Sequence, residues 1–287
     1  MSNGPSAAIL PDGRLHLQHG PIDLVISADG PMEAVDSAFR AAAGRFVSVL
    51  NELVEELPLL RRPVDPDSEM TGLIASRMVR AVTPHAHGTF VTPMAAVAGA
   101  VADEIVDVMT ASAPLTRAIV NNGGDIAIHL LPGQIAHARL VATDNADLGS
   151  VTIAGGSGIG GIATSGREGR SLSLGIADSV TVLARSAAEA DAAATLLANA
   201  VDLPDHPAVT RAPAETLDPD SDLGSRLVTT GCGRLTREEK YAAVSSGILL
   251  GQSMIDRGLI RGAAFFLQGH ARTVGSFNRL DRGTPDV

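Results

Sequence analysis

The segment Ser179–Val201 reads SVTVLARSAAEADAAATLLANAV, and its pattern changes from strand to helix near the middle. The first half belongs to a predicted strand over Asp178–Ala184, where β-branched and other apolar residues dominate. Ser186-Ala-Ala-Glu189 then has the form of a capping box, which predicts a helix over Ala187–Val201. A strand that passes directly into a helix indicates a mixed α and β architecture.

Hairpin patterns alternate with helical ones on both sides of this segment. Two alternating stretches near the start predict a hairpin within residues 1–30, and Pro31 opens an amphipathic helix. Further strands are predicted over Arg117–Val120, Ile126–Leu131, His137–Thr143 and Val151–Ala154. Residues 203–233 are rich in Pro, Asp and Gly, which predicts an irregular insertion. This order predicts a single α+β domain over residues 1–287, with a largely antiparallel sheet and packed helices.

The composition excludes several classes of partner. The chain has 287 residues, a net charge of −10 and a single lysine, Lys240, so binding to nucleic acid is not expected. No apolar run approaches the roughly 18 residues of a membrane span, and the first residues carry no signal-peptide pattern. We therefore expect a cytoplasmic protein with no membrane partner. The lone Cys232 rules out a disulfide framework.

A glycine-rich loop, GGSGIGGIATSG at Gly155–Gly166, precedes the strand and contains a complete GxGxxG. Asp178 follows Gly158 by 20 residues, which is the spacing of a dinucleotide-binding fingerprint. That fingerprint needs a helix after the glycines and an acid at the end of the next strand. Here REGRSLSLG follows without a helical stripe, and Asp178 begins its strand, so NAD binding is not supported. A loop that wraps another ligand and a plain turn between strands both remain open.

Four segments, in this order along the chain, resemble the ApbE-like superfamily, whose best-known members are FAD:protein FMN transferases. They are AVAGAVAD (Ala96–Asp103), VNNGGDIAI (Val120–Ile128), IATSG (Ile162–Gly166) and the Ser179–Val201 segment. In that superfamily the corresponding runs read roughly GxxKGxxxD, VNxGGD, TSG, and a strand followed by a helix with DxxxT. The resemblance covers about Thr92–Val201 and implies an ApbE-like fold.

The resemblance also implies a nucleotide site and a magnesium site. The positions that match the nucleotide-binding motifs are Gly99, Asp103, Asn121, Gly123, Gly124, Asp125, Thr164, Ser165 and Gly166. The Mg²⁺ ligands implied by the same motifs are Asp191, Thr195 and a backbone carbonyl near Val97. Asp191 and Thr195 stand four residues apart, so they share one helix face, and oxygen ligands suit Mg²⁺ better than zinc. The alternative is that Asp191 is a solvated helix residue and Thr195 borders the core.

Two departures from the superfamily pattern keep several functions open. Ala98 stands where the motif has lysine, and REGRSLSLG replaces the His-x-x-Asp-Pro-x-x-Gly segment that follows the TSG of active transferases. The first hypothesis is a protein that binds FAD or a related nucleotide and carries out Mg²⁺-dependent FMN transfer or FAD pyrophosphate cleavage. The alternatives are a non-catalytic flavin-binding module, and an enzyme that acts on a small non-flavin substrate through His85, His87, Arg167 and Arg170. The substrate, any acceptor protein and homo-oligomer formation are left open.

Overall fold

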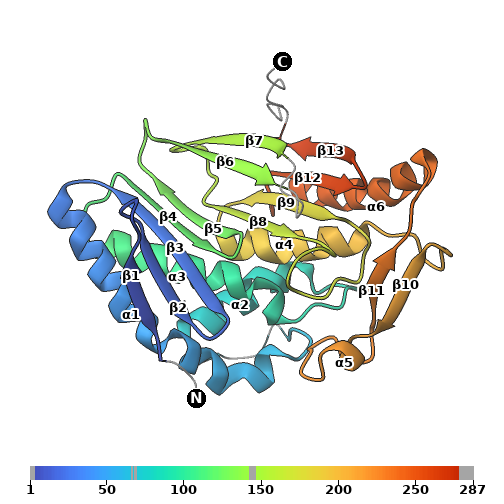
Figure 1. Ribbon diagram of the computed structural model, residues 1–287, viewed down its shortest axis with the longest axis horizontal. Helices are drawn as coiled ribbons and strands as arrows, with labels where there is room; N and C mark the ends of the chain where they lie inside the picture. Colours follow the sequence, from blue (N-terminus) through green and yellow to red (C-terminus); the bar gives the residue numbers. More distant parts are fainter. Residues whose placement is uncertain (1–3, 66, 68–69, 142–146, 278–287) are drawn as a thin grey trace. The chain divides into compact units, whose positions relative to one another are not determined.

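The computed structural model describes residues 4–65, 67, 70–141 and 147–277, and Figure 1 shows their elements coloured along the chain. The chain folds as two compact units, each built from several separate segments of the sequence. Unit 1 comprises Met1–Ile135, Ala154–Ala163 and Ala184–Ala192, and unit 2 comprises Ala136–Ile153, Thr164–Leu183 and Ala193–Val287. The chain therefore passes from one unit to the other five times.

The strands of unit 1 pair in the order β1-β2-β3-β4-β5-β8. Their bounds are β1 Ser6–Ile9, β2 Leu15–His19, β3 Ile22–Asp29, β4 Arg117–Asn122, β5 Asp125–Leu130 and β8 Gly161–Ser165. Only the first three residues of β8 belong to this unit. Neighbouring strands are antiparallel, with Leu17 opposite Leu24 and Val120 opposite Ala127. Alternate leucine and isoleucine side chains of β2 and β3 are buried, so one face of these strands belongs to the core.

The helices of unit 1 pack on these strands. They are α1 Met32–Leu60, α2 Leu73–Val82, α3 Val97–Ser112 and the first turns of α4 Ala187–Ala200, together with the 3₁₀ turns η1 Thr83–His85 and η2 Pro93–Ala96. α3 contacts β4 and β5, and α1 contacts α3 and β2 (Figure 1). Every residue of α3 from Gly99 to Val106 is buried, including two acids. At Gly99 the missing Cβ lets the backbone of α4 approach closely.

Unit 2 contains the strand order β8-β9-β12-β13 and two separate ribbons. The bounds are β9 Ser179–Ala184, β12 Gly262–Leu267 and β13 His270–Gly275, with the ribbons β6 Ile135–Val141 and β7 Asp147–Ala154, and β10 Val209–Pro213 and β11 Leu227–Cys232. The helices are the part of α4 from Ala193 onward, α5 Ala214–Leu217 and α6 Arg237–Asp256. α6 packs on β12 and β13 (Figure 1). A Cβ atom at Gly247 or Gly251 would contact the ring of Phe265.

The predicted α+β architecture with antiparallel strands and packed helices is confirmed. The hairpin predicted within residues 1–30 is β2–β3, preceded by the unpredicted edge strand β1, while residues 1–3 lie outside the described part of the chain. β6 corresponds to the strand predicted over His137–Thr143, of which residues 142–143 also lie outside the described ranges. That residues 1–287 form a single domain stays a prediction.

Two sequence predictions need correction. Residues 203–233 are not irregular, because they contain the antiparallel ribbon β10–β11 and the short helix α5. Most of the ribbon's side chains are half-buried, so no strict apolar alternation marks its strands in the sequence. The glycine-rich loop is shorter than predicted, since Gly161–Ser165 at its end forms β8. Within the described ranges, no helix is both long enough and apolar enough to cross a membrane.

Candidate functional site

The residues predicted from the sequence fall in both units. Unit 1 holds Val97, Gly99, Asp103, Asn121, Gly123, Gly124, Asp125 and Asp191. Unit 2 holds Thr164, Ser165, Gly166 and Thr195. The unit 1 group gathers around the N-termini of α3 and α4, and this region is the candidate site.

The N-terminus of α3 is held by a carboxylate from α4. α3 begins at Val97 after the 3₁₀ turn η2, and its N-cap residue, Ala96, has no side chain that can accept a hydrogen bond. The backbone N–H of Gly99 donates instead to Oδ2 of Asp191, at 3.0 Å. The carboxylate thus satisfies a donor that a helix start leaves open.

The environment of Asp191 disfavours its negative charge. Burial raises the pKa of Asp191 well above its ordinary value, and the nearby charge of Asp125 raises it further. The backbone N–H groups of Gly99 and Ala98 act in the opposite direction and are outweighed. Two acids near one helix start are therefore a place where a cation would lower the electrostatic free energy.

The N-terminus of α4 is held in the same way by α3. The carboxylate of Asp103 accepts hydrogen bonds from the backbone N–H groups of Ala187 and Ala188, both at 2.9 Å. Asp103 is only 4% exposed, and burial raises its pKa to about 6 even though the two N–H groups lower it. We call the two carboxylates the reciprocal caps, because Asp103 of α3 holds the start of α4 and Asp191 of α4 holds the start of α3. Both oxygens of Asp103 are used in this way, so we assign Asp103 a structural role.

Glycines permit the close approach of α3, α4 and β8. A Cβ atom at Gly99 would lie 2.7 Å from the Ala188 nitrogen and closer still to the Ala187 carbonyl. A Cβ atom at Gly161, the third glycine of the GxGxxG, would overlap the peptide between Ser186 and Ala187. Packing against the start of α4 therefore explains both glycines. No local pattern in the sequence marks this role of Gly161, because its partner is distant in the chain.

The turn between β4 and β5 is a two-residue hairpin turn at Gly123 and Gly124. Their φ values are +65° and +113°, which glycine adopts without strain. Oδ1 of Asn121 accepts the N–H of Gly124 at 2.8 Å, so Asn121 stabilises the turn itself. Asn122, which was not among the predicted site residues, is buried and donates from Nδ2 to the Ala98 carbonyl at 3.1 Å. It links the turn to the first turn of α3.

The predicted residues of unit 2 have well-defined surroundings there. The hydroxyl oxygens of Thr164 and Thr181 lie 2.8 Å apart. Gly166 is buried, and a Cβ atom there would overlap the Asp178 carbonyl, which explains the glycine. Ser165 and Thr195 are half-buried, and Thr195 stands one turn after Asp191 on α4.

The residues of the non-flavin hypothesis do not share one environment. His85 is buried in η1, whereas His87 is exposed. Arg167 forms ion pairs with Asp178 at 2.6 Å and with Glu168 at 2.9 Å, so its guanidinium is neutralised by acids of the chain itself. Arg170 is exposed. Among the residues that the structure describes, no group of three or more His, Cys, Asp or Glu side chains is arranged to hold a metal ion.

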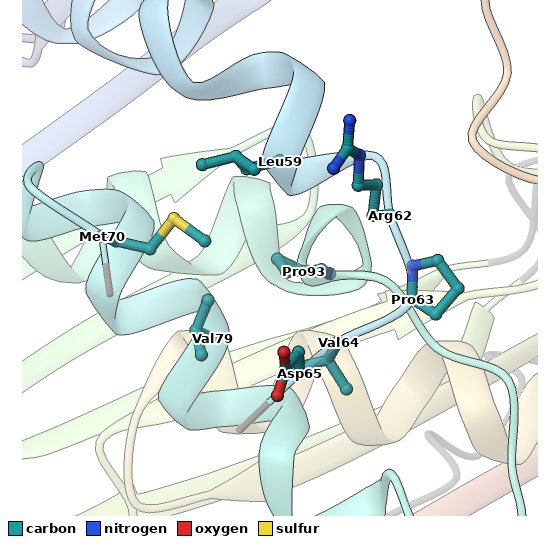
Figure 2. Close-up of a pocket in the computed structure, with 8 residues that line it drawn as sticks. All are labelled: Leu59, Arg62, Pro63, Val64, Asp65, Met70, Val79 and Pro93. Atoms are coloured by element: carbon teal, nitrogen blue, oxygen red, sulfur yellow. The ribbon is translucent and has the colours of Figure 1, made fainter. Parts of the chain in front are cut away.

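A pocket of about 340 Å³ lies elsewhere in unit 1, and Figure 2 shows the side chains that surround it. It is lined by Leu59, Arg62, Pro63, Val64, Asp65, Met70, Val79 and Pro93. Its walls come from the end of α1, the following segment, α2 and η2. None of the site residues predicted from the sequence lines this pocket.

The fold is that of the ApbE-like proteins. It matches the crystal structure of the ApbE protein from Thermotoga maritima with a TM-score of 0.53 and 12% sequence identity, over 97% of this chain and 99% of that one. The chain belongs to the family described as AbpE bacteria, whose model matches residues 7–273. The resemblance drawn from the sequence motifs is thereby confirmed at the level of fold and family.

Relatives with higher sequence identity are named UPF0280 proteins. One from Methanopyrus kandleri is 35% identical over 179 residues, which cover 62% of this chain and 69% of the relative. Another from Methanothrix thermoacetophila is 43% identical over 122 residues, which cover 41% of this chain and 49% of the relative. The second match thus spans about half the length of that relative.

Proposed function

We propose that the protein binds FAD or a related nucleotide together with Mg²⁺, at the start of α3 and α4. The observation that carries this proposal is the position of Asp191. It holds the N-terminus of α3, and burial and the charge of Asp125 raise its pKa. A divalent cation bound at Asp191 would compensate this negative charge and attract the phosphates of a nucleotide.

The donor atoms available on the chain fit Mg²⁺. The Asp191 carboxylate, which accepts the Gly99 N–H through Oδ2, would supply the charged oxygen ligand. The Val97 carbonyl, which belongs to the same unit, would add a second oxygen ligand, and oxygen is the donor type that Mg²⁺ prefers. When bound, the ion would neutralise charge on a pyrophosphate. Asn122 would support this set by holding the Ala98 carbonyl, next to that of Val97.

Such binding has two possible consequences. The protein either catalyses FMN transfer or FAD cleavage, or it binds the nucleotide without catalysing a reaction. Catalysis is the expectation carried by the superfamily resemblance. The non-catalytic flavin-binding module is the second candidate, and two observations favour it. Ala98 provides no charge where the superfamily motif has lysine. Arg167, in the segment that replaces the superfamily histidine, is engaged by Asp178 and Glu168.

The binding proposal is tested by calorimetric titration of FAD, FMN, ADP and AMP in Mg²⁺ and in EDTA. We expect at least one of these ligands to bind more tightly in Mg²⁺. The substitution Asp191→Asn should reduce that Mg²⁺-dependent gain by about tenfold or more, because it removes the charged ligand. An amide oxygen can still accept the N–H of Gly99, so the variant should fold.

The matched control is Asp107→Asn, which removes an acid of α3 whose side chain is 61% exposed. It should leave nucleotide affinity unchanged. No binding of any ligand by folded wild-type protein would reject the proposal and favour a different substrate. If binding is found, incubation with FAD and Mg²⁺ decides the outcome: release of FMN and AMP, or transfer of FMN to a protein, supports catalysis, and intact FAD supports the binding module.

A further inference from the structure

A cluster of basic and aromatic side chains lies where α6 begins and β13 starts, within unit 2. We call it the Tyr241 cluster: Arg237, Lys240, Tyr241, His270 and Arg272. Arg237 precedes Lys240 by three residues and Tyr241 by four, so the three occupy adjoining positions on α6. His270 and Arg272 are two residues apart on β13 and lie on one face of the strand. The cluster contains the only lysine and the only tyrosine of the chain.

Contacts between these side chains hold the tyrosine ring in place while leaving much of it open. The Arg272 guanidinium carbon is 5.6 Å from the Tyr241 ring centroid, as in a cation–π pair. The His270 ring meets the same tyrosine edge to face, with centroids 6.4 Å apart. Lys240 Nζ donates to the Gln268 carbonyl at 3.1 Å, next to the start of β13. Tyr241 nevertheless remains 54% exposed.

The cluster is positively charged although the chain as a whole carries −10. Burial lowers the pKa of His270, and the positive charges of Arg272, Lys240 and Arg237 lower it further. The three cations Arg237, Lys240 and Arg272 outnumber the two acids of the same turn, Glu238 and Glu239. Glu239 accepts the Thr236 N–H at 2.7 Å and contacts His206 at 3.0 Å, and Glu238 is the remaining exposed acid.

We propose that the Tyr241 cluster binds a nucleoside monophosphate. The phosphate would be bound by Arg237, Lys240 and Arg272, since guanidinium and ammonium groups form strong charge-assisted hydrogen bonds with phosphate. The base would stack on the exposed part of the Tyr241 ring, as aromatic side chains do in single-stranded nucleic-acid sites. A bare phosphate would leave the ring unused, and a neutral nucleoside would leave the cations unused. This binding needs no metal ion, and it does not rest on the Mg²⁺ proposal.

The chain provides its own reporter for this site. Tyr241 is the only tyrosine and the chain has no tryptophan, so tyrosine fluorescence comes from this cluster alone. Titration in EDTA with AMP, adenosine and inorganic phosphate, corrected for absorbance by the ligand, should change this fluorescence. We expect AMP to bind about tenfold more tightly than adenosine or phosphate, because only AMP uses both the cations and the ring.

Variants make the assignment specific. Arg272→Gln and Lys240→Gln should each weaken AMP binding by about tenfold, the loss expected for a charged hydrogen bond. Arg257→Gln, which removes an exposed arginine at the opposite end of α6, should leave the affinity unchanged. Equal affinity for phosphate and AMP, an equal loss in the Arg257 control, or no binding by folded protein would each overturn the proposal. EDTA keeps this result independent of the Mg²⁺-dependent function.

Discussion

Replacing Gly99 with alanine is expected to lower the free energy of unfolding by about 3 kcal/mol or more, at the upper end of overpacking effects. The new methyl group would lie within 2.7 Å of the Ala188 nitrogen and would overlap the Ala187 carbonyl. Those neighbours are backbone atoms of α4, so they cannot rotate aside as a flexible side chain can. Either α3 must move away from α4, or the hydrogen bonds that the reciprocal caps accept must lengthen.

The control for this prediction is Gly44→Ala. Gly44 is an exposed residue within α1, and a Cβ atom there would meet nothing within 4 Å. Alanine should therefore stabilise the protein by about 0.5–1 kcal/mol through helix propensity. Urea unfolding followed by circular dichroism measures both variants. A Gly99→Ala protein as stable as the wild type would show that the two helices do not approach so closely.

The second large effect concerns pH. Between pH 4 and pH 7, the unfolding free energy of Asp103→Asn is expected to rise by roughly 2 kcal/mol relative to the wild type. Burial raises the pKa of Asp103 from an ordinary 3.8 to about 6 in the folded protein. The stability that this group contributes is therefore fully present below about pH 4 and is lost as the pH rises through about 6. Asparagine does not titrate and loses nothing over this range.

Urea unfolding of both proteins at several pH values tests this expectation, because the other titrating groups are common to both and cancel in the difference. Asp107→Asn, on the exposed side of α3, should show a much smaller pH dependence relative to the wild type. If the difference moved in the opposite direction, the hydrogen bonds from Ala187 and Ala188 would outweigh burial. Asp103 would then behave like an ordinary exposed N-cap carboxylate.

Elements with local signals were predictable from the sequence. The turn residues of VNNGGD correctly indicated the β4–β5 hairpin, because only glycine adopts its two positive φ values easily. The start of α4 was also predicted from Ser186, whose Oγ accepts the Glu189 N–H at 3.3 Å. The Glu189 side chain, however, pairs with Arg185 at 2.8 Å.

The rest depends on contacts between distant parts of the chain. Asp103 and Asp191 match superfamily motifs, yet nothing in their local sequence shows that each carboxylate caps the other helix. The ribbon β10–β11 was missed for a similar reason. Arg211, on β10, is engaged by Asp202, the Leu174 carbonyl and the Thr229 hydroxyl, and no periodicity reveals such a network.

The alternation of the chain between the two units affects how the protein emerges from the ribosome. α3 is complete once Ser112 has been made, but the carboxylate that holds its N-terminus lies 92 residues after Gly99. At a synthesis rate of about 5–20 residues per second, the nascent helix waits on the order of ten seconds for that partner. During this interval the N-terminus of α3 lacks its Asp191 cap, whereas α1, β4 and β5, on which α3 also packs, have already been made by Leu130.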